Sequence, residues 1–92
     1  EQSVNLAVLM SIVSSVTNKP IPNDTAFIAD VGLTGELKKV PAVESRIREL
    51  ARMGFRNVYI ACSEGNIKKP EGITVYEMKT LKEVIISLFG FV

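Results

Sequence analysis

Two glycines stand close together between a run of β-prone residues and a basic segment with helical periodicity. The run Ala26-Phe27-Ile28-Ala29-Asp30 leads directly into Val31-Gly32-Leu33-Thr34-Gly35-Glu36. Because glycine adopts backbone conformations that other residues avoid, this spacing indicates a chain that turns sharply and then returns. The pattern predicts a strand over residues 25–31, a tight turn, and a second short strand over residues 36–40.

Helical and extended patterns alternate along the rest of the chain. Apolar residues recur at steps of three and four in the first segment, which Ser3 or Asn5 can cap. Pro41 fits the first turn of a second helix, and Thr80 can cap a third. The predicted helices end near residues 17, 53 and 89, and the predicted strands cover residues 25–31, 36–40, 57–62 and 73–77.

This order of elements predicts an α/β fold with a small mixed sheet and three helices. Strands that alternate with helices favour parallel pairing of residues 25–31 with residues 57–62, through a right-handed crossover. The first helix is apolar almost all round, so we expect it to be buried on more than one side. A chain of 92 residues corresponds to one small domain or to part of one.

The segment that follows the first glycine also resembles a known family. The run V-G-L-T-G-E-L-K-K-V, followed by V-E-S-R-I-R-E-L-A-R-M-G-F-R-N-V-Y-I, is similar to the C-terminal Lon-protease-like domain of bacterial DNA-repair proteins of the RadA (Sms) type. The resemblance covers nearly the whole chain and implies a Lon-protease-like, or ribosomal S5 domain 2-like, subdomain. Residues 1–92 are therefore expected to be one subdomain of a longer protein.

The resemblance also implies what lies outside this chain. In RadA-type proteins a zinc finger and a RecA-like ATPase domain accompany the Lon-like domain, and the whole protein assembles into a ring. We therefore expect this chain to carry no cofactor of its own, with ATP, magnesium and zinc confined to the other domains. The expected partners are further copies of the chain, DNA, and the RecA-like ATPase domain of the same polypeptide.

The Lon relationship raises the question of a serine–lysine peptidase. Such a dyad needs a lysine kept neutral by desolvation, within hydrogen-bond reach of a serine hydroxyl. By resemblance, the serine position falls on Ser3 and the lysine position on Glu44. A carboxylate does not replace the amine, so we expect a vestigial dyad and no enzyme activity in this chain. The structural alternatives are a helix cap for Ser3, and a first-turn residue paired with Arg48 for Glu44.

The basic segment is the main candidate for binding. Residues 38–56 carry six basic against two acidic side chains, a net +4, whereas residues 1–37 carry −3 and residues 57–92 are neutral. Arginines on a rigid helix suit phosphate, because the planar guanidinium donates two hydrogen bonds at once. A solvated face with Glu–Arg pairs is the alternative. The predicted DNA-binding residues are Lys38, Lys39, Arg46, Arg48, Arg52 and Arg56.

Other motifs have structural explanations. Gly32 and Gly35 lack the following lysine and hydroxyl residue of a P-loop, so they indicate a turn. Asp24, Asp30 and Glu36 form at most a thin metal site in a chain without histidine. The single cysteine, Cys62, follows an apolar strand, and we expect it in the core rather than as a reactive thiol.

The end of the chain is rich in apolar residues, and Phe91 and Val92 extend beyond the stripe of the last helix. They are candidates for a subunit interface, with core packing as the alternative. No leader-like start or membrane-length apolar run is visible, so a cytoplasmic location is expected.

These observations favour a non-catalytic Lon-like domain that serves ring assembly and DNA contact in a DNA repair and recombination ATPase. A pure oligomerisation scaffold without DNA binding is the first alternative. A Lon-type serine peptidase is the second, and Glu44 argues against it.

Overall fold

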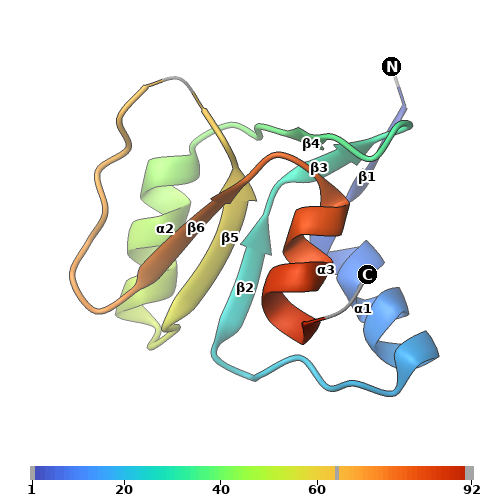
Figure 1. The fold of residues 1–92 in the computed structure, drawn as a ribbon. Coiled ribbons are helices and arrows are strands. Elements are labelled where there is room, and N and C mark those ends of the chain that lie inside the picture. Colours follow the sequence, from blue (N-terminus) through green and yellow to red (C-terminus); the bar gives the residue numbers. More distant parts are fainter. Residues whose placement is uncertain (1, 64, 91–92) are drawn as a thin grey trace.

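The computed structural model describes residues 2–63 and 65–90, which form three helices and six strands. Phe91 and Val92, predicted as interface residues, lie outside the described residues. Figure 1 shows the path of the chain through these elements. In chain order they are β1 (Ser3–Asn5), α1 (Leu6–Thr17), β2 (Thr25–Ile28), β3 (Asp30–Gly32), β4 (Leu37–Lys38), α2 (Val43–Arg52), β5 (Asn57–Ala61), β6 (Thr74–Met78) and α3 (Leu81–Phe89).

The strands form two three-stranded sheets, so the prediction of one small mixed sheet is wrong in this respect. One sheet is parallel, in the order β2-β5-β6, and the other is antiparallel, in the order β1-β3-β4. The strand predicted over residues 25–31 divides at Ala29, and its two halves enter different sheets. The predicted parallel pairing is confirmed, with Phe27 opposite Tyr59. The α/β class is therefore correct.

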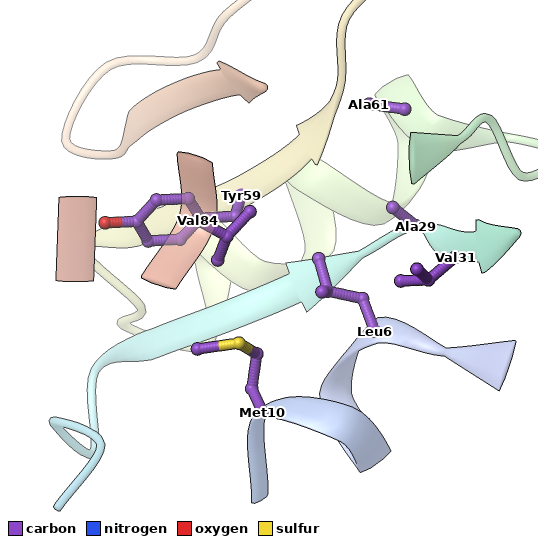
Figure 2. Close-up of a cluster of buried hydrophobic side chains, with 7 residues drawn as sticks. All are labelled: Leu6, Met10, Ala29, Val31, Tyr59, Ala61 and Val84. Atoms are coloured by element: carbon purple, nitrogen blue, oxygen red, sulfur yellow. The ribbon is translucent and has the colours of Figure 1, made fainter. Parts of the chain in front are cut away.

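Helices cover both faces of the parallel sheet. On one face, α1 and α3 contribute to one buried cluster, and Figure 2 shows Val84 of α3 beside Tyr59 and Leu6 and Met10 pointing from α1 toward β2. The ring of Tyr59 stacks between Phe27 and Tyr76, with ring centroids 5.6 and 4.6 Å away. The buried members of this cluster are Leu6, Met10, Ala29, Val31, Tyr59, Ala61 and Val84.

The second helix covers the opposite face. Ile47 is fully buried there, and the flanking Val43, Leu50 and Ala51 pack against the same cluster, as the helical periodicity predicted. The alternation of side chains along each strand explains the arrangement, because Ile28 and Ile60 point to this face while their neighbours point to the other. The buried residues of this cluster are Ile28, Ile47, Val58, Ile60 and Ile73.

The first helix differs from the prediction. Asn5 caps it by accepting a hydrogen bond from the Val8 amide at 3.2 Å, whereas Ser3 lies in β1. The helix buries Leu6 and Met10, but the side chains of Val8, Ile12 and Val16 are 52%, 53% and 80% exposed. Burial on more than one side is therefore wrong for this chain. The three exposed residues, spaced by four, form an apolar stripe along the outer face of α1.

The two-glycine turn is present as predicted, and it connects β3 to β4 within the antiparallel sheet. The Gly35 amide donates to the Gly32 carbonyl at 3.1 Å, and Gly35 has a φ of +89°, which favours glycine. A Cβ on Gly32 would lie 2.7 Å from the Glu36 carboxylate. The Gly35 carbonyl accepts from the amide of Leu81 at 2.9 Å, which anchors the turn to the start of α3.

Candidate nucleic-acid interface

The second helix carries three of the six basic side chains of the predicted interface, Arg46, Arg48 and Arg52. It begins after Ala42, whose φ of +59° is left-handed, and no side chain caps its first turn. With Ile47 buried against the sheet, successive residues rotate by about 100°, so Arg48 and Arg52 point outward one turn apart. Both are exposed. The predicted outward orientation of this arginine pair is confirmed.

One of the outward arginines is partly neutralised. Nη1 of Arg52 lies 3.1 Å from Oε1 of Glu49, in an ion pair between side chains that are 74% and 60% exposed. Exposed pairs of this kind stabilise a helix by only a few tenths of a kcal/mol, about 0.3–0.5. The pair therefore constrains Arg52 weakly and leaves its guanidinium accessible.

The six predicted residues do not form one patch. Arg46 is two residues from Arg48, which places it about 200° away around the helix, and it lines a cleft with Ala26 and Phe27 of β2. Lys38 and Lys39 lie at the end of the antiparallel sheet, before the helix begins. At the other end of the helix, Arg56 precedes β5, and its amide donates to the Asp24 carbonyl at 3.0 Å. The basic residues thus spread along the length of α2 and around it.

A loop that the charge balance did not single out brings a further basic residue, Lys68, close to one side of α2. The Lys68 amide donates to Oε2 of Glu44 at 3.2 Å, so the loop after β5 lies against the first turn of the helix. Arg48 follows one turn later on that side of the helix. Lys69, next in the loop, pairs with Glu77 at 3.2 Å. Because residues 57–92 are neutral as a whole, only the tertiary contact could reveal this proximity.

The vestigial dyad positions have structural partners of other kinds. Ser3 is paired in register with Gly32, in the strand that precedes α1, so its predicted role as the helix cap is wrong. Glu44 lies in the first turn of α2, as predicted, but its carboxylate accepts from the Lys68 amide rather than pairing with Arg48. The lining of the cleft beside Glu44 includes Lys39 and Ser63 but not Ser3.

The cysteine prediction was also wrong. Cys62 follows the last residue of β5 and is exposed, although its amide still donates to the Met78 carbonyl at 2.8 Å. The strand ends one residue earlier than predicted, which turns the side chain out of the core.

Two further observations concern metals and membranes. Within residues 2–63 and 65–90, no three histidine, cysteine, aspartate or glutamate residues gather in a way that could hold a metal ion. None of the helices in those ranges combines the length and apolarity needed to cross a bilayer.

Comparison with known proteins identifies a set of relatives. No protein-family model matches the chain. The chain is 38% identical to the DNA repair protein RadA of Listeria monocytogenes over 86 residues, which are 92% of this chain and 19% of that protein. It is 36% identical to RadA of Escherichia coli K12 over 85 residues, 92% of this chain and 18% of the relative. The RadA of Streptococcus pyogenes serotype M1 is 38% identical over 91 residues, 98% of this chain and 20% of the relative.

The chain thus spans about a fifth of the length of the curated relatives that it matches. The match extends over almost the whole chain, which is consistent with a RadA C-terminal domain. The resemblance read from the glycine turn and the basic helix is confirmed.

Proposed function

Because this chain is a domain of the RadA type, we propose that it serves a longer DNA repair protein as a non-catalytic, Lon-like module for assembly and DNA contact. The name of the relatives connects them with DNA repair. The observation that carries the DNA role is the exposed pair Arg48 and Arg52 on the outer side of α2.

A rigid helix suits this role. Ile47 anchors α2 to the sheet, so the two arginines are displayed on a fixed scaffold, and their guanidinium groups match phosphate geometry. Lys68 lies in the neighbouring loop, where its amide contact with Glu44 brings it close to the Arg48 side of the helix. Lys38, Lys39 and Arg56 would contact DNA only if the duplex followed the length of the helix.

The expected affinity of one copy is modest. Few phosphates can be neutralised by a chain with a net charge of +1, so binding by one domain should be weak and salt-sensitive. A ring would present the same arginines several times and raise the apparent affinity without a new contact. Ring assembly and a neighbouring RecA-like ATPase domain are therefore part of the proposal, as is a cytoplasmic location.

The absence of peptidase activity is also part of the proposal. The position that resembles the catalytic lysine holds Glu44, whose carboxylate is engaged by a backbone amide. Ser3 lies in a strand rather than at the beginning of the helix. A serine-directed covalent probe that labels Ser3 would contradict this part.

A pure scaffold is the second candidate, and the apolar stripe of α1 favours it. Val8, Ile12 and Val16 are exposed on a helix that contains no charged residue. Such a face suits contact with another protein surface better than contact with DNA. In this case charge reversal on α2 would leave any DNA retention unchanged.

Sedimentation velocity with a fluorescent branched DNA, at low and moderate salt, tests the two candidates. We expect a salt-dependent shift of the DNA boundary that the double variant Arg48→Glu/Arg52→Glu abolishes. The matched control is Lys79→Glu/Lys82→Glu, which changes the net charge equally at exposed positions around the start of α3. Equal losses in both variants, or DNA that sediments alone beside oligomeric protein, would contradict DNA contact through α2.

A further inference from the structure

A leucine stands almost uncovered at the tip of the turn between β3 and β4. The side chain of Leu33 is 82% exposed, the highest value among the large apolar residues in the described ranges. The turn beneath it is held by the Gly35 amide, which donates to the Gly32 carbonyl, and by the Thr34 hydroxyl, which donates to the Glu36 carboxylate. A side chain presented on such a fixed turn loses little conformational entropy when it docks.

A hollow adjoins the same turn. Its volume is about 510 Å³, and Figure 1 shows its two walls, the β3–β4 turn and the start of α3, at one end of the molecule. The Leu81 amide donates to the Gly35 carbonyl at 2.9 Å, which joins the walls. The half-buried Leu81 and Ile85 give the hollow its apolar part. Its lining residues are Thr34, Gly35, Thr80, Leu81, Lys82 and Ile85.

The exposed leucine and the hollow lie side by side on one surface. Leu33 does not line the hollow and so does not fill it, whereas the next residue, Thr34, forms part of its wall. Their Cα atoms are only about 3.8 Å apart. A two-fold rotation can therefore bring the leucine of each copy over the hollow of the other, which is the condition for a self-complementary interface. A lone apolar side chain from another molecule would fill the hollow but leave Leu33 uncovered.

The charges on this surface are also complementary to themselves. Glu36 follows the turn and Lys82 lies on the rim of the hollow, and both side chains are exposed. Within residues 2–63 and 65–90, neither forms an ion pair. The carboxylate of Glu83, next to Lys82, accepts from the Lys79 amide at 2.8 Å. The same two-fold rotation brings Glu36 of each copy toward Lys82 of the other, so the charges favour a second copy over DNA, whose phosphates Glu36 would repel.

We propose that two copies of this chain pair across a two-fold axis at the β3–β4 turn, each placing Leu33 in the hollow beside Leu81 and Ile85 of the other. Glu36 of each copy faces Lys82 of the other copy. The pairing rests on the proposed assembly role and assigns one surface to it, but it uses none of the six residues proposed to contact DNA. Because the contact is small, we expect a dissociation constant on the order of 0.1–1 mM for this chain.

Sedimentation velocity of the 92-residue chain at concentrations up to about 1 mM tests the pairing. We expect the sedimentation coefficient to rise with concentration toward that of a dimer. Leu33→Asp should raise the dissociation constant at least about tenfold, because the change acts twice across a two-fold axis. The matched control is Val16→Asp, which adds the same charge at a side chain that is 80% exposed and should leave the pairing unchanged.

A wild-type chain that stays monomeric at this concentration would overturn the proposal. Equal weakening by Leu33→Asp and Val16→Asp would also overturn it, because it would mean general association of apolar surfaces. Oligomers that persist in Leu33→Asp would overturn this surface while leaving assembly through another face intact.

A pair of charge reversals gives a test that depends on the second copy. Lys82→Glu and Glu36→Lys each place like charges opposite one another in a homodimer, and each should weaken pairing by about tenfold at low salt. An equal mixture of the two variants has opposite charges at both contacts and should pair about as well as the wild type. We expect unlabelled Glu36→Lys to produce saturable shifts of the Gly35 and Leu81 amides in ¹⁵N-labelled Lys82→Glu.

The ¹H–¹⁵N spectrum of each variant alone shows whether it is folded. Two folded variants that do not associate when mixed would overturn the two-fold arrangement. Retention of DNA is compared separately, at protein concentrations below the dissociation constant of the dimer, where Leu33→Asp should bind DNA as the wild type does. Loss of pairing and loss of DNA contact are thereby distinguished.

Discussion

Two isoleucines on different helices allow a direct test of which helix faces are covered in solution. Ile47 of α2 is fully buried between the helix and the parallel sheet, whereas Ile12 of α1 is 53% exposed. The same substitution, isoleucine to alanine, removes the same three carbon atoms at each site. We expect Ile47→Ala to destabilise the domain strongly and Ile12→Ala to leave its stability nearly unchanged.

The expected loss of folding free energy for Ile47→Ala follows from the complete burial of this side chain. Three lost carbons correspond to roughly 2.4 kcal/mol of transfer free energy, and the cavity left behind raises the total to about 3 kcal/mol. The entropy of unfolding is about 2.1 cal/mol/K per residue, so for 92 residues this loss lowers Tm by about 15 °C. For Ile12, the lost partial burial is offset by the higher helix propensity of alanine, about 0.4 kcal/mol.

Urea denaturation and thermal scans at two protein concentrations measure both effects. Ile47→Val is a milder companion, expected to cost about 1 kcal/mol. A loss of about 3 kcal/mol for Ile12→Ala as well would refute the reasoning, because it would mean that the outer face of α1 is buried in the species being unfolded.

Further substitutions test local features of the fold. Asn5→Ala should cost about 1 kcal/mol in urea denaturation, because it removes the cap of α1, whereas Ser3→Ala should be neutral; equal effects would mean that Asn5 is not the cap. Ala42→Gly should stabilise the domain by about 0.5 kcal/mol in the same assay, since the left-handed φ of +59° disfavours alanine; destabilisation would show that the strain is absent. The hydroxyl of Thr34 donates to the Glu36 carboxylate at 2.5 Å and lowers the pKa of that carboxyl below its usual value. The ionised Glu36 carboxylate therefore contributes its full stabilisation at pH values above the pKa of the unfolded chain. This stabilisation is lost as the pH falls through the lowered pKa of the folded state. Thr34→Val should raise the pKa in an NMR titration of the Glu36 carboxyl, and an unchanged midpoint would exclude this cause.

Much of the fold follows from local pattern. The apolar periodicity around Ile47 identifies the buried side of α2. Thr80 and Gly90 bound α3 as predicted, and the Thr80 hydroxyl accepts a hydrogen bond from the Glu83 amide at 3.1 Å. These features depend on residues within a few positions of one another, so the sequence displays them directly.

The missed features depend on distant partners. β1 is three exposed residues, and its pairing with β3 comes from residues nearly thirty positions away. Nothing in the apolar run through Ala29 indicates that the chain passes from one sheet to the other at this residue. The proximity of Lys68 to α2 likewise depends on a tertiary contact.

The change of sheet at Ala29 has a consequence for how the domain opens. Strands β2 and β3 are consecutive pieces of one backbone, and the Ala29 carbonyl between them accepts from the first amide of α1 at 3.0 Å. One sheet cannot separate from the rest of the domain without pulling on the other through this peptide junction. Amide hydrogens in both sheets should therefore exchange with solvent through one cooperative unfolding event. The two sheets then behave as a single foldon and do not open independently.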